Sequence, residues 1–242
     1  MTILCVVFDA VGTLIHPKRP VAQTYAGVGY DHGSKLTEAQ IEKSFSQAYG
    51  AATKSRETLQ TNETTEYKFW HEVVSAVFHD VPTAKRKDIL IELWSHFGTA
   101  AAWNIFDDVL ATLHHLRQEK VTIAVGSNLD RRLHTVCDGL GISNLADRTF
   151  DSASVGYNKP SPHFFQYVQS ELGYQPQQLV MVGDDLHVDV DGAIGSRWNA
   201  IWVNRHHAGS DAGVTASTRR ANVVEVNTLQ NLHESLAMIA TD

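Results

Sequence analysis

The sequence predicts an α/β fold, in which a Rossmann-like parallel sheet carries helices on both faces and an all-helical cap domain is inserted. Short apolar, β-branched runs alternate with helical patterns over most of the chain, which is typical of parallel strands buried on both faces. The alternation is interrupted once, by a long segment with helical patterns only. With 242 residues, the chain is long enough to bury a sizeable core as one domain, or as one domain with an insertion.

The predicted strands are apolar runs bounded by polar or glycine positions. Four are expected at 3–8, 121–126, 178–183 and 200–204, with weaker or shorter ones at 148–154 and 223–226. Helices are expected between them at 106–119, 131–140, 162–172 and about 187–198. The first of these helices carries Val109, Leu113 and Leu116 on one stripe, which would face the sheet.

Between about residues 18 and 98 the sequence predicts helices and no strand. One begins with a capping box formed by Thr37 and Gln40, and a staple formed by Leu36 and Ile41. The next two carry the apolar stripes Phe69, Val73, Val77 and Ile89, Leu93, Phe97. We therefore expect residues 17–98 to form a helical cap domain, called the helical insert below, and residues 1–16 and 99–242 to form the α/β core domain. The alternative is a helical layer packed directly on the sheet.

Charge and composition restrict the classes of function. The formal net charge of −7 argues against nucleic acid or an anionic membrane as the main partner. No apolar run approaches the roughly 18 residues of a membrane span, and the N-terminus leads directly into a strand without a secretory pattern. Cys5 and Cys137 are expected to be reduced, buried thiols. We expect a cytoplasmic protein that binds a small molecule, with a surface loop at 206–221; the oligomeric state cannot be read from the sequence.

Open parallel sheets bind ligands beyond the carboxyl ends of their strands. At these ends, or in a turn that opens a helix, the sequence places Asp9, Ser127, Asn128, Lys159, Asp184, Asp185 and Asp189. Each has a purely structural explanation: Asp9 could cap a turn, Ser127 or Asp185 could cap a helix, and Lys159 could be a solvated loop residue. Together they favour a site, because acids, a hydroxyl and a lysine all fall where the strands end.

This set of side chains suits phosphoryl transfer. Two or three carboxylates around one point form an oxygen-only site for Mg²⁺, and a lysine and a hydroxyl can hold a tetrahedral anion with backbone N–H groups. A carboxylate at the strand tip, Asp9, could attack phosphorus in line and form an aspartyl-phosphate. The metal and the lysine would stabilise charge on the equatorial oxygens.

Four motifs in order resemble those of the haloacid dehalogenase-like hydrolases. They are FDAVGTL at 8–14, VGSN at 125–128, NKPSP at 158–162 and VGDDLHVDVDGA at 182–193. The resemblance spans almost the whole chain, and the helical insert lies where C1-capped members of the family carry their cap.

The resemblance implies a metal site built around the first and fourth motifs. Asp9 would be the nucleophile and a Mg²⁺ ligand, with the backbone carbonyl of Val11 and the carboxylate of Asp184 as further ligands. Asp189 corresponds to the second acid of the fourth motif, where it would support the metal or orient Lys159.

The second and third motifs imply a phosphate site. Ser127 and Lys159 would bind the phosphate, Lys159 would also act in catalysis, and Asn128 would help to shape the pocket. Asp185 stands where the family often has serine, and the resemblance assigns it no role.

Val11 departs from the pattern of the family's phosphatases, which usually have a second aspartate at this position. That acid protonates the leaving oxygen and later deprotonates the attacking water, which valine cannot do. Such help is typically worth ~10²–10⁴ in rate, so its loss would slow the reaction without abolishing it. His16 and His32 are candidates for a replacement acid, although hinge or surface roles explain both more simply.

Three functions remain open. The preferred one is a Mg²⁺-dependent phosphatase or phosphotransferase that acts on a small phosphorylated metabolite. The second is a dehalogenase, in which Asp9 attacks carbon without metal, but Asp184 and Asp185 stand where those enzymes use serine and asparagine. The third is a catalytically impaired phosphate-binding or interaction protein. The presence of Asp9, Lys159, Asp184 and Asp189 together argues against it.

Overall fold

A parallel sheet forms the centre of the computed structural model, which describes residues 2–56, 60–205 and 223–241. The described residues form a six-stranded sheet in the order β5-β4-β1-β6-β7-β8, with every neighbouring pair parallel. The strands are β1 (Cys5–Phe8), β4 (Thr122–Ser127), β5 (Arg148–Asp151), β6 (Leu179–Gly183), β7 (Asn199–Val203) and β8 (Val223–Val226). In the central register, Phe8 lies opposite Val125 on one side and Val182 on the other. The predicted fold class is confirmed.

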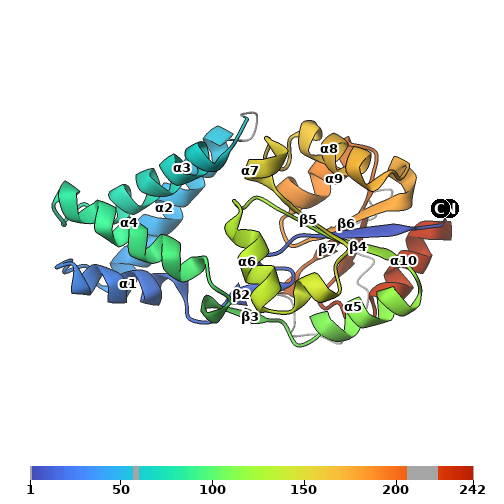
Figure 1. Ribbon diagram of the computed structural model, residues 1–242, viewed down its shortest axis with the longest axis horizontal. Helices are drawn as coiled ribbons and strands as arrows, with labels where there is room; N and C mark the ends of the chain where they lie inside the picture. Colours follow the sequence, from blue (N-terminus) through green and yellow to red (C-terminus); the bar gives the residue numbers. More distant parts are fainter. Residues whose placement is uncertain (1, 57–59, 206–222, 242) are drawn as a thin grey trace.

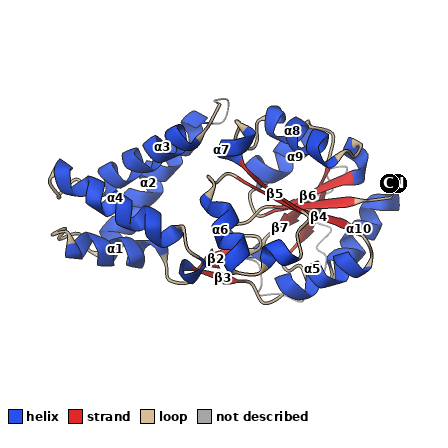
Figure 2. Cartoon of the chain, in the orientation of Figure 1, coloured by secondary structure: helices blue, strands red, loops and turns tan. Residues whose placement is uncertain are grey.

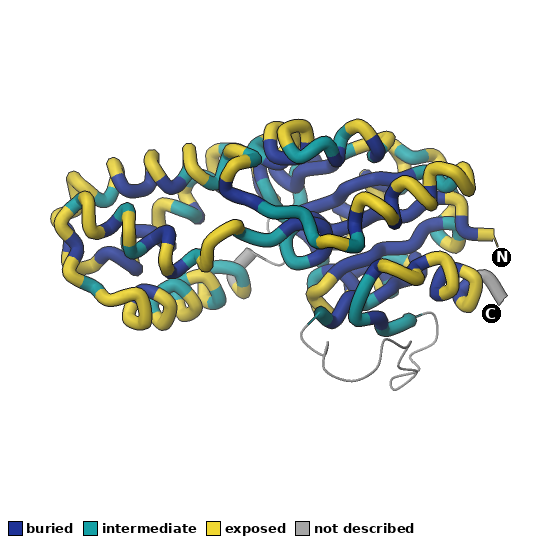
Figure 3. The backbone as a smooth tube through the Cα atoms, turned by 90° about the horizontal axis from the view of Figure 1, so that it is seen from below, coloured by how far each residue is buried: buried dark blue, intermediate teal, exposed yellow. Residues whose placement is uncertain are grey.

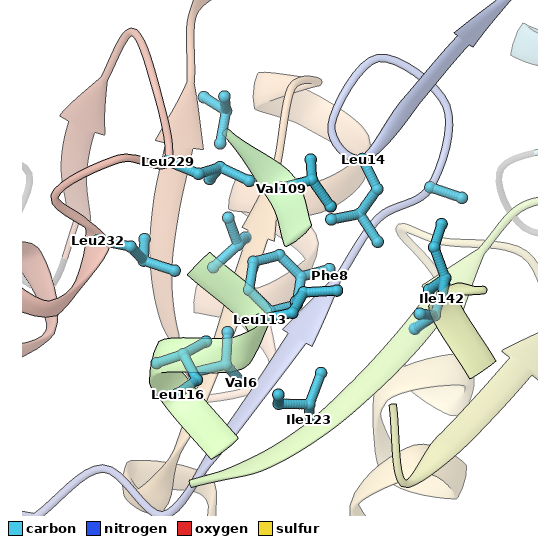
Figure 4. Packing of buried hydrophobic residues seen from close by; sticks show 14 of the residues in the cluster. Val6, Phe8, Leu14, Val109, Leu113, Leu116, Ile123, Ile142, Leu229 and Leu232 are labelled. Carbon is cyan, nitrogen blue, oxygen red and sulfur yellow. The ribbon is translucent and has the colours of Figure 1, made fainter. Parts of the chain in front are cut away.

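Helices cover both faces of this sheet (Figures 1 and 2). They are α5 (Val109–Gln118), α6 (Arg132–Gly139), α7 (Ser152–Val155), α8 (Pro162–Leu172), α9 (Gly192–Gly195) and α10 (Leu232–Thr241). Successive residues of β1 point to opposite faces, so Val6 and Phe8 pack in a cluster with α5, α6 and α10 (Figure 4). Cys5 and Val7 pack in a second cluster with α8 and α9. The alternation places the two clusters on opposite faces of the sheet, whose central strands are buried (Figure 3).

The helical insert lies between two short strands, β2 (Ile15–Pro17) and β3 (Trp103–Ile105), which pair antiparallel. It contains α1 (Val21–Asp31), α2 (Glu38–Arg56), α3 (Glu63–Val77) and α4 (Thr83–Phe97). These helices pack around a buried cluster of their own, which includes Tyr25, Ile41, Val77 and Leu93, and they extend away from the sheet (Figure 1). No helix among the described residues combines the length and the apolar character needed to cross a membrane. The division into domains at residues 17 and 98 stays a prediction.

The helical insert also touches the core domain away from the β2–β3 pair. The guanidinium of Arg132, at the start of α6, lies 3.5 Å from the ring centroid of Trp94 in α4. At the other end of the insert, the Thr61 N–H donates to the Gly156 carbonyl at 2.9 Å, and the Arg131 N–H donates to Glu63 at 3.0 Å. These contacts hold the insert over the carboxyl end of β4.

The structure differs from the sequence-based elements in four places. The weaker strand predicted at 148–154 ends at Asp151, and α7 follows it. The β2–β3 pair and α10 were not expected; for the pair, the reason is that three-residue strands show no usable periodicity. The segment predicted as a helix at about 187–198 is helical over residues 186–195, but it begins as a π-helical turn over Leu186–Asp191 and continues as the short helix α9. It ends earlier than predicted, and Arg197 then takes a φ of 64°. Such wide turns are frequent at functional sites, and this one carries Asp189. The surface loop expected at 206–221 lies outside the described residues.

A half-buried carboxylate, that of Asp108, helps to join the end of β7 to the loop after β1. Asp108 accepts hydrogen bonds from Arg205 at 3.0 and 3.1 Å, from the Thr228 hydroxyl at 2.7 Å and from the Leu229 N–H at 2.8 Å. Arg205 also donates to the carbonyl of Thr13 at 2.7 Å. Burial alone would raise the pKa of Asp108, but these donors outweigh burial and lower it.

We expect Asp108→Asn to lower the free energy of unfolding at pH 7 by about 1–3 kcal/mol, since several bonds to a charged acceptor weaken. Because the native pKa is lowered, this stabilisation exists above the ordinary carboxyl pKa of about 3.9 and is lost as the pH falls through the native value. Urea denaturation from pH 3 to pH 7 measures it. The exposed neighbour Asp107→Asn serves as the control, and a constant gap between wild type and Asp108→Asn over this range would contradict the assignment.

Candidate active site

Three acidic side chains meet beyond the carboxyl ends of β1 and β6. Asp9 directly follows β1, and its N–H donates to the Val182 carbonyl at 2.8 Å. Asp184 directly follows β6, and Asp189 lies in the π-helical turn after it. One carboxylate oxygen of each lies within 4.8 Å of the others. The parallel register of β1 and β6 brings together residues that are far apart in the sequence.

Lys159 reaches this cluster from the turn before α8. Its Nζ donates to Oδ1 of Asp9 at 2.8 Å and to Oδ1 of Asp189 at 2.6 Å, and the residue is only 2% exposed. Burial alone would lower the pKa of Lys159, but the charges of Asp189 and Asp9 reverse this and raise it. The lysine is therefore a buried cation held between two carboxylates.

Asn128 fixes the backbone that carries this lysine. The Lys159 N–H donates to Oδ1 of Asn128 at 2.7 Å, and Nδ2 of Asn128 donates to the Lys159 carbonyl at 2.8 Å. Its neighbour Ser127 ends β4, is 3% exposed, and lines the same cavity. The structure thus brings Ser127, Asn128 and Lys159 together, with the Asn128 amide engaged by the lysine backbone.

The loop after β1 is shaped by its backbone. The Ile15 N–H donates to the Ala10 carbonyl at 2.9 Å, and the Gly12 N–H donates to the Ile15 carbonyl at 2.8 Å, so the chain turns tightly around Val11. Gly12 has a φ of 91°, and a Cβ there would overlap the carboxylate of Asp184. Only glycine fits such a position without strain. The Thr13 hydroxyl then donates to Oδ1 of Asp184 at 3.2 Å.

The turn after β6 aims Asp189 back at the lysine. Oδ1 of Asp185 accepts from the N–H groups of His187 and Val188, both at 2.8 Å, and so caps this turn. The Asp185 N–H donates to Oδ2 of Asp189 at 3.2 Å. A Cβ at Gly183 would overlap the Asp189 side chain. The structural explanation of Asp185 as an N-cap is confirmed, although Asp185 also lines the cavity.

The site carries more negative than positive charge. Burial and the nearby charge of Asp9 raise the pKa of Asp184 to about 6. Burial also raises the pKa of Asp189, to about 7, with the charges of Asp9 and Asp184 acting in the same direction and Lys159 in the opposite one. Three carboxylates face one ammonium group. An oxygen-only donor set with excess negative charge fits a hard divalent cation such as Mg²⁺.

Val11 lines the cavity beside this cluster, whereas neither histidine considered as a replacement acid does. Nδ1 of His16 lies 3.0 Å from the Pro17 carbonyl in β2. Nε2 of His32 lies 3.0 Å from Glu92 on the helical insert. The hinge and surface interpretations of these two residues agree with the structure.

Sequence reasoning missed the opposite wall of the cavity. A space of about 390 Å³ extends from Asp9 and Val11 into the helical insert, where its lining includes Tyr25, Phe45, Tyr49, Trp70, Trp94 and Phe97. Arg132 of the core domain lines it as well. In the sequence these aromatic residues form ordinary apolar stripes of helices, so only the position of the insert beyond the carboxyl ends of the strands identifies them.

Comparison with known proteins supports the resemblance to the haloacid dehalogenase-like hydrolases. The family model described as haloacid dehalogenase-like hydrolase matches residues 3–196. A hydrolase of Schizosaccharomyces pombe, described as uncharacterized, is 32% identical over 203 residues, which cover 81% of this chain and 88% of the relative. Haloacid dehalogenase-like hydrolase domain-containing protein 3 of Mus musculus is 30% identical over 190 residues, which cover 77% of this chain and 76% of that protein.

Solved structures share the fold along nearly the whole chain. A defluorinating L-2-haloacid dehalogenase has a TM-score of 0.75 at 17% identity, over 97% of this chain and 95% of its own. The magnesium-bound hydrolase YfnB from Bacillus subtilis has a TM-score of 0.72 at 15% identity, covering 98% and 100%. A phosphatase from Thermococcus onnurineus has a TM-score of 0.65 at 23% identity, covering 98% of each chain. With the matched family model and the shared fold, the chain belongs to the haloacid dehalogenase-like hydrolases.

Proposed function

We propose that this hydrolase is a Mg²⁺-dependent phosphatase or phosphotransferase that acts on a small phosphorylated metabolite through an aspartyl-phosphate on Asp9. The observation that carries the proposal is the position of Asp9 at the strand tip, with Lys159 on one oxygen and Asp184 and Asp189 within 4.8 Å. A dehalogenase needs no cation, whereas this cluster of acids would be unfavourable without one.

The ligands that we propose for Mg²⁺ are Asp9, Asp184 and the backbone carbonyl of Val11. When bound, the cation would neutralise charge on the phosphoryl oxygens. Asp189 belongs to the same acidic cluster, and its two oxygens already accept from Lys159 and from the Asp185 N–H. We therefore propose that Asp189 supports the metal site mainly by holding Lys159 in place.

The chain's own residues would carry the other steps. The ammonium group of Lys159 would orient Asp9 and bind a phosphoryl oxygen, together with the Ser127 hydroxyl. Asp9 would attack phosphorus, and the leaving oxygen would depart with the bonding electron pair. Water would then release phosphate and regenerate Asp9. Val11 supplies no proton at either step, so the substrate must have a leaving group that departs as an anion.

The comparisons support both catalytic alternatives. Two of the structural neighbours, a magnesium-bound hydrolase and a phosphatase, favour the proposal. The dehalogenase among the neighbours, together with the non-acidic Val11, keeps carbon–halogen cleavage as the second candidate. Loss of turnover with retained phosphate binding is the third.

A cytoplasmic location is part of the proposal. Both cysteines, Cys5 and Cys137, are free and buried, and burial raises the pKa of each thiol to about 12. Such thiols are unreactive and compatible with a reducing compartment. The partner that we propose is a small phosphorylated substrate, with no nucleic acid and no membrane.

We expect the protein to release phosphate from p-nitrophenyl phosphate and acetyl phosphate only when Mg²⁺ is present. Asp9→Asn should lower this turnover at least about 10³-fold, because it removes the nucleophile. Phosphate release measures the effect, with the exposed Asp107→Asn as the control. Metal-independent halide release from 2-chloropropionate, without phosphate release from either phosphate compound, would establish the dehalogenase instead.

The missing acid can be tested by restoring it. Val11→Asp should raise kcat on alkyl phosphates, which are poor leaving groups, by between about 10² and 10⁴, and should change p-nitrophenyl phosphate turnover much less. Val11→Asn is the matched control, since it has the same size and polarity without an acid. An equal response to both substitutions would mean that another group already supplies the proton.

Charge repulsion at the site predicts a gain in stability when one acid is removed. Because the native pKa of Asp184 is raised to about 6, its ionised form destabilises the folded state above that pH, and the effect disappears below the ordinary value of about 3.9. In metal-free buffer at pH 8, Asp184→Asn should raise the midpoint of thermal unfolding by about 2–4 °C.

Adding Mg²⁺ to the same samples tests the metal site. Mg²⁺ should raise the unfolding midpoint of the wild type more than that of Asp184→Asn. The control is Asp138→Asn, which changes an exposed acid of α6 and should respond to Mg²⁺ like the wild type. An equal Mg²⁺ shift in all three proteins would rule out Asp184 as a ligand.

A further inference from the structure

The cavity over Asp9 has an aromatic wall, which we define as Tyr25, Phe45, Tyr49, Trp70, Trp94 and Phe97. All four helices of the insert contribute to it. The rings are in sequential contact: the centroids of Tyr25 and Phe45 are 5.1 Å apart, those of Phe45 and Tyr49 5.6 Å, and those of Tyr49 and Trp70 5.9 Å. Phe97 extends this series, since its ring centroid lies 6.4 Å from that of Tyr25, and Trp94 lines the same cavity. The wall therefore presents an aromatic surface opposite the carboxylates.

Polar groups are few at this end of the cavity. Among the described residues that line it on the helical insert, the polar side-chain groups are the hydroxyls of Thr53, Tyr25 and Tyr49 and the indole N–H groups of Trp70 and Trp94. The remaining cation nearby, Arg132, is held by Asp130, which accepts from Nε at 2.8 Å and from Nη2 at 2.7 Å. Its Nη1 donates to the Trp94 carbonyl at 3.3 Å.

This lining discriminates between classes of leaving group. A sugar or polyol would bring many hydroxyls against the aromatic wall, and most of them would lose their hydrogen bonds to water without replacement. A flat aromatic ring would instead stack on or meet the edges of the wall's rings. The lining thus favours an apolar ring beside the phosphate.

The lack of an acid at Val11 independently favours an aromatic leaving group. The valine cannot protonate a leaving oxygen, so an alkoxide would leave slowly. A phenol has a pKa of about 10, as in the tyrosine side chain, and its oxygen departs as the phenolate without a proton. Asp9 would form the new bond to phosphorus while the bond from phosphorus to the aryl oxygen breaks, and the phenolate would carry away the electron pair.

We infer that the enzyme is an aryl phosphatase, whose substrate places an aromatic ring on the aromatic wall and its phosphate at Asp9 and Lys159. The inference rests on the proposed function and adds the identity of the leaving group. The specificity-determining residue that we select is Trp70, which is half-buried and lines the cavity.

Kinetics with Mg²⁺ on three substrates test the inference. Acetyl phosphate has a good leaving group but no ring, phenyl phosphate has one ring, and 2-naphthyl phosphate has two with a similar leaving-group pKa. We expect kcat/KM for 2-naphthyl phosphate to exceed that for phenyl phosphate by about tenfold or more, since added apolar contact in a pocket discriminates on this scale.

Substitutions test whether the aromatic wall causes the higher kcat/KM for 2-naphthyl phosphate. Trp70→Ala should lower the ratio of kcat/KM for 2-naphthyl phosphate to that for acetyl phosphate by about tenfold. The ratio is independent of how much of the variant folds. Tyr30→Ala should leave it unchanged, because Tyr30 is a 78% exposed aromatic of α1 that does not line the cavity.

Binding gives a readout that does not depend on turnover. By calorimetry, the wild type should bind 2-naphthylphosphonate with a lower dissociation constant than methylphosphonate. The difference between the two dissociation constants should be smaller in Trp70→Ala. Hydrolysis of acetyl phosphate with no preference for 2-naphthyl phosphate, or with a ratio unchanged in Trp70→Ala, would overturn the inference and leave the proposed function standing. Release of phosphate from none of the three substrates would overturn the proposed function itself.

Discussion

The ammonium group of Lys159 lies between the carboxylates of Asp9 and Asp189, at 2.8 and 2.6 Å. A buried lysine is tolerated only when its charge is paired, and this pairing draws together the ends of β1, β6 and the turn before α8. Asn128 locks the lysine backbone, and Gly183 leaves the space that Asp189 needs. The rest of the site is arranged around this one buried cation.

The charged half of the cavity belongs to the sheet, and the apolar half belongs to the helical insert. Parallel strands end at the same edge, so their terminal residues concentrate polar groups there. The insert is held over this edge by the stacking of Arg132 on Trp94 and by the contact between Thr61 and Gly156. In the proposed function, the core domain would supply the chemistry and the helices above it would select what the phosphate is attached to.

Much of the core domain was predictable from local pattern. The strands at 3–8 and 178–183 are short, apolar and β-branched, and a buried parallel strand permits no other composition. The turn over Leu186–Asp191 was not predictable, because its acidic, amphipathic sequence also fits a regular helix. This conformation is stabilised by the Asp185 cap and by the hydrogen bond between Asp189 and Lys159. The β2–β3 pair is too short to leave a periodic signal.

The sequence by itself determined the order of the strands along the chain, the acids and the lysine at their ends, and the valine where an acid is usual, because each depends on residue type and spacing. Only the tertiary structure decided which residues of the helical insert line the cavity opposite the carboxylates. The aromatic wall comes from four separate helices, and a stripe that packs inside a bundle has the same spacing as one that lines a cavity. The two kinds of stripe can be told apart only from the position of the insert, which depends on contacts between residues distant in the chain.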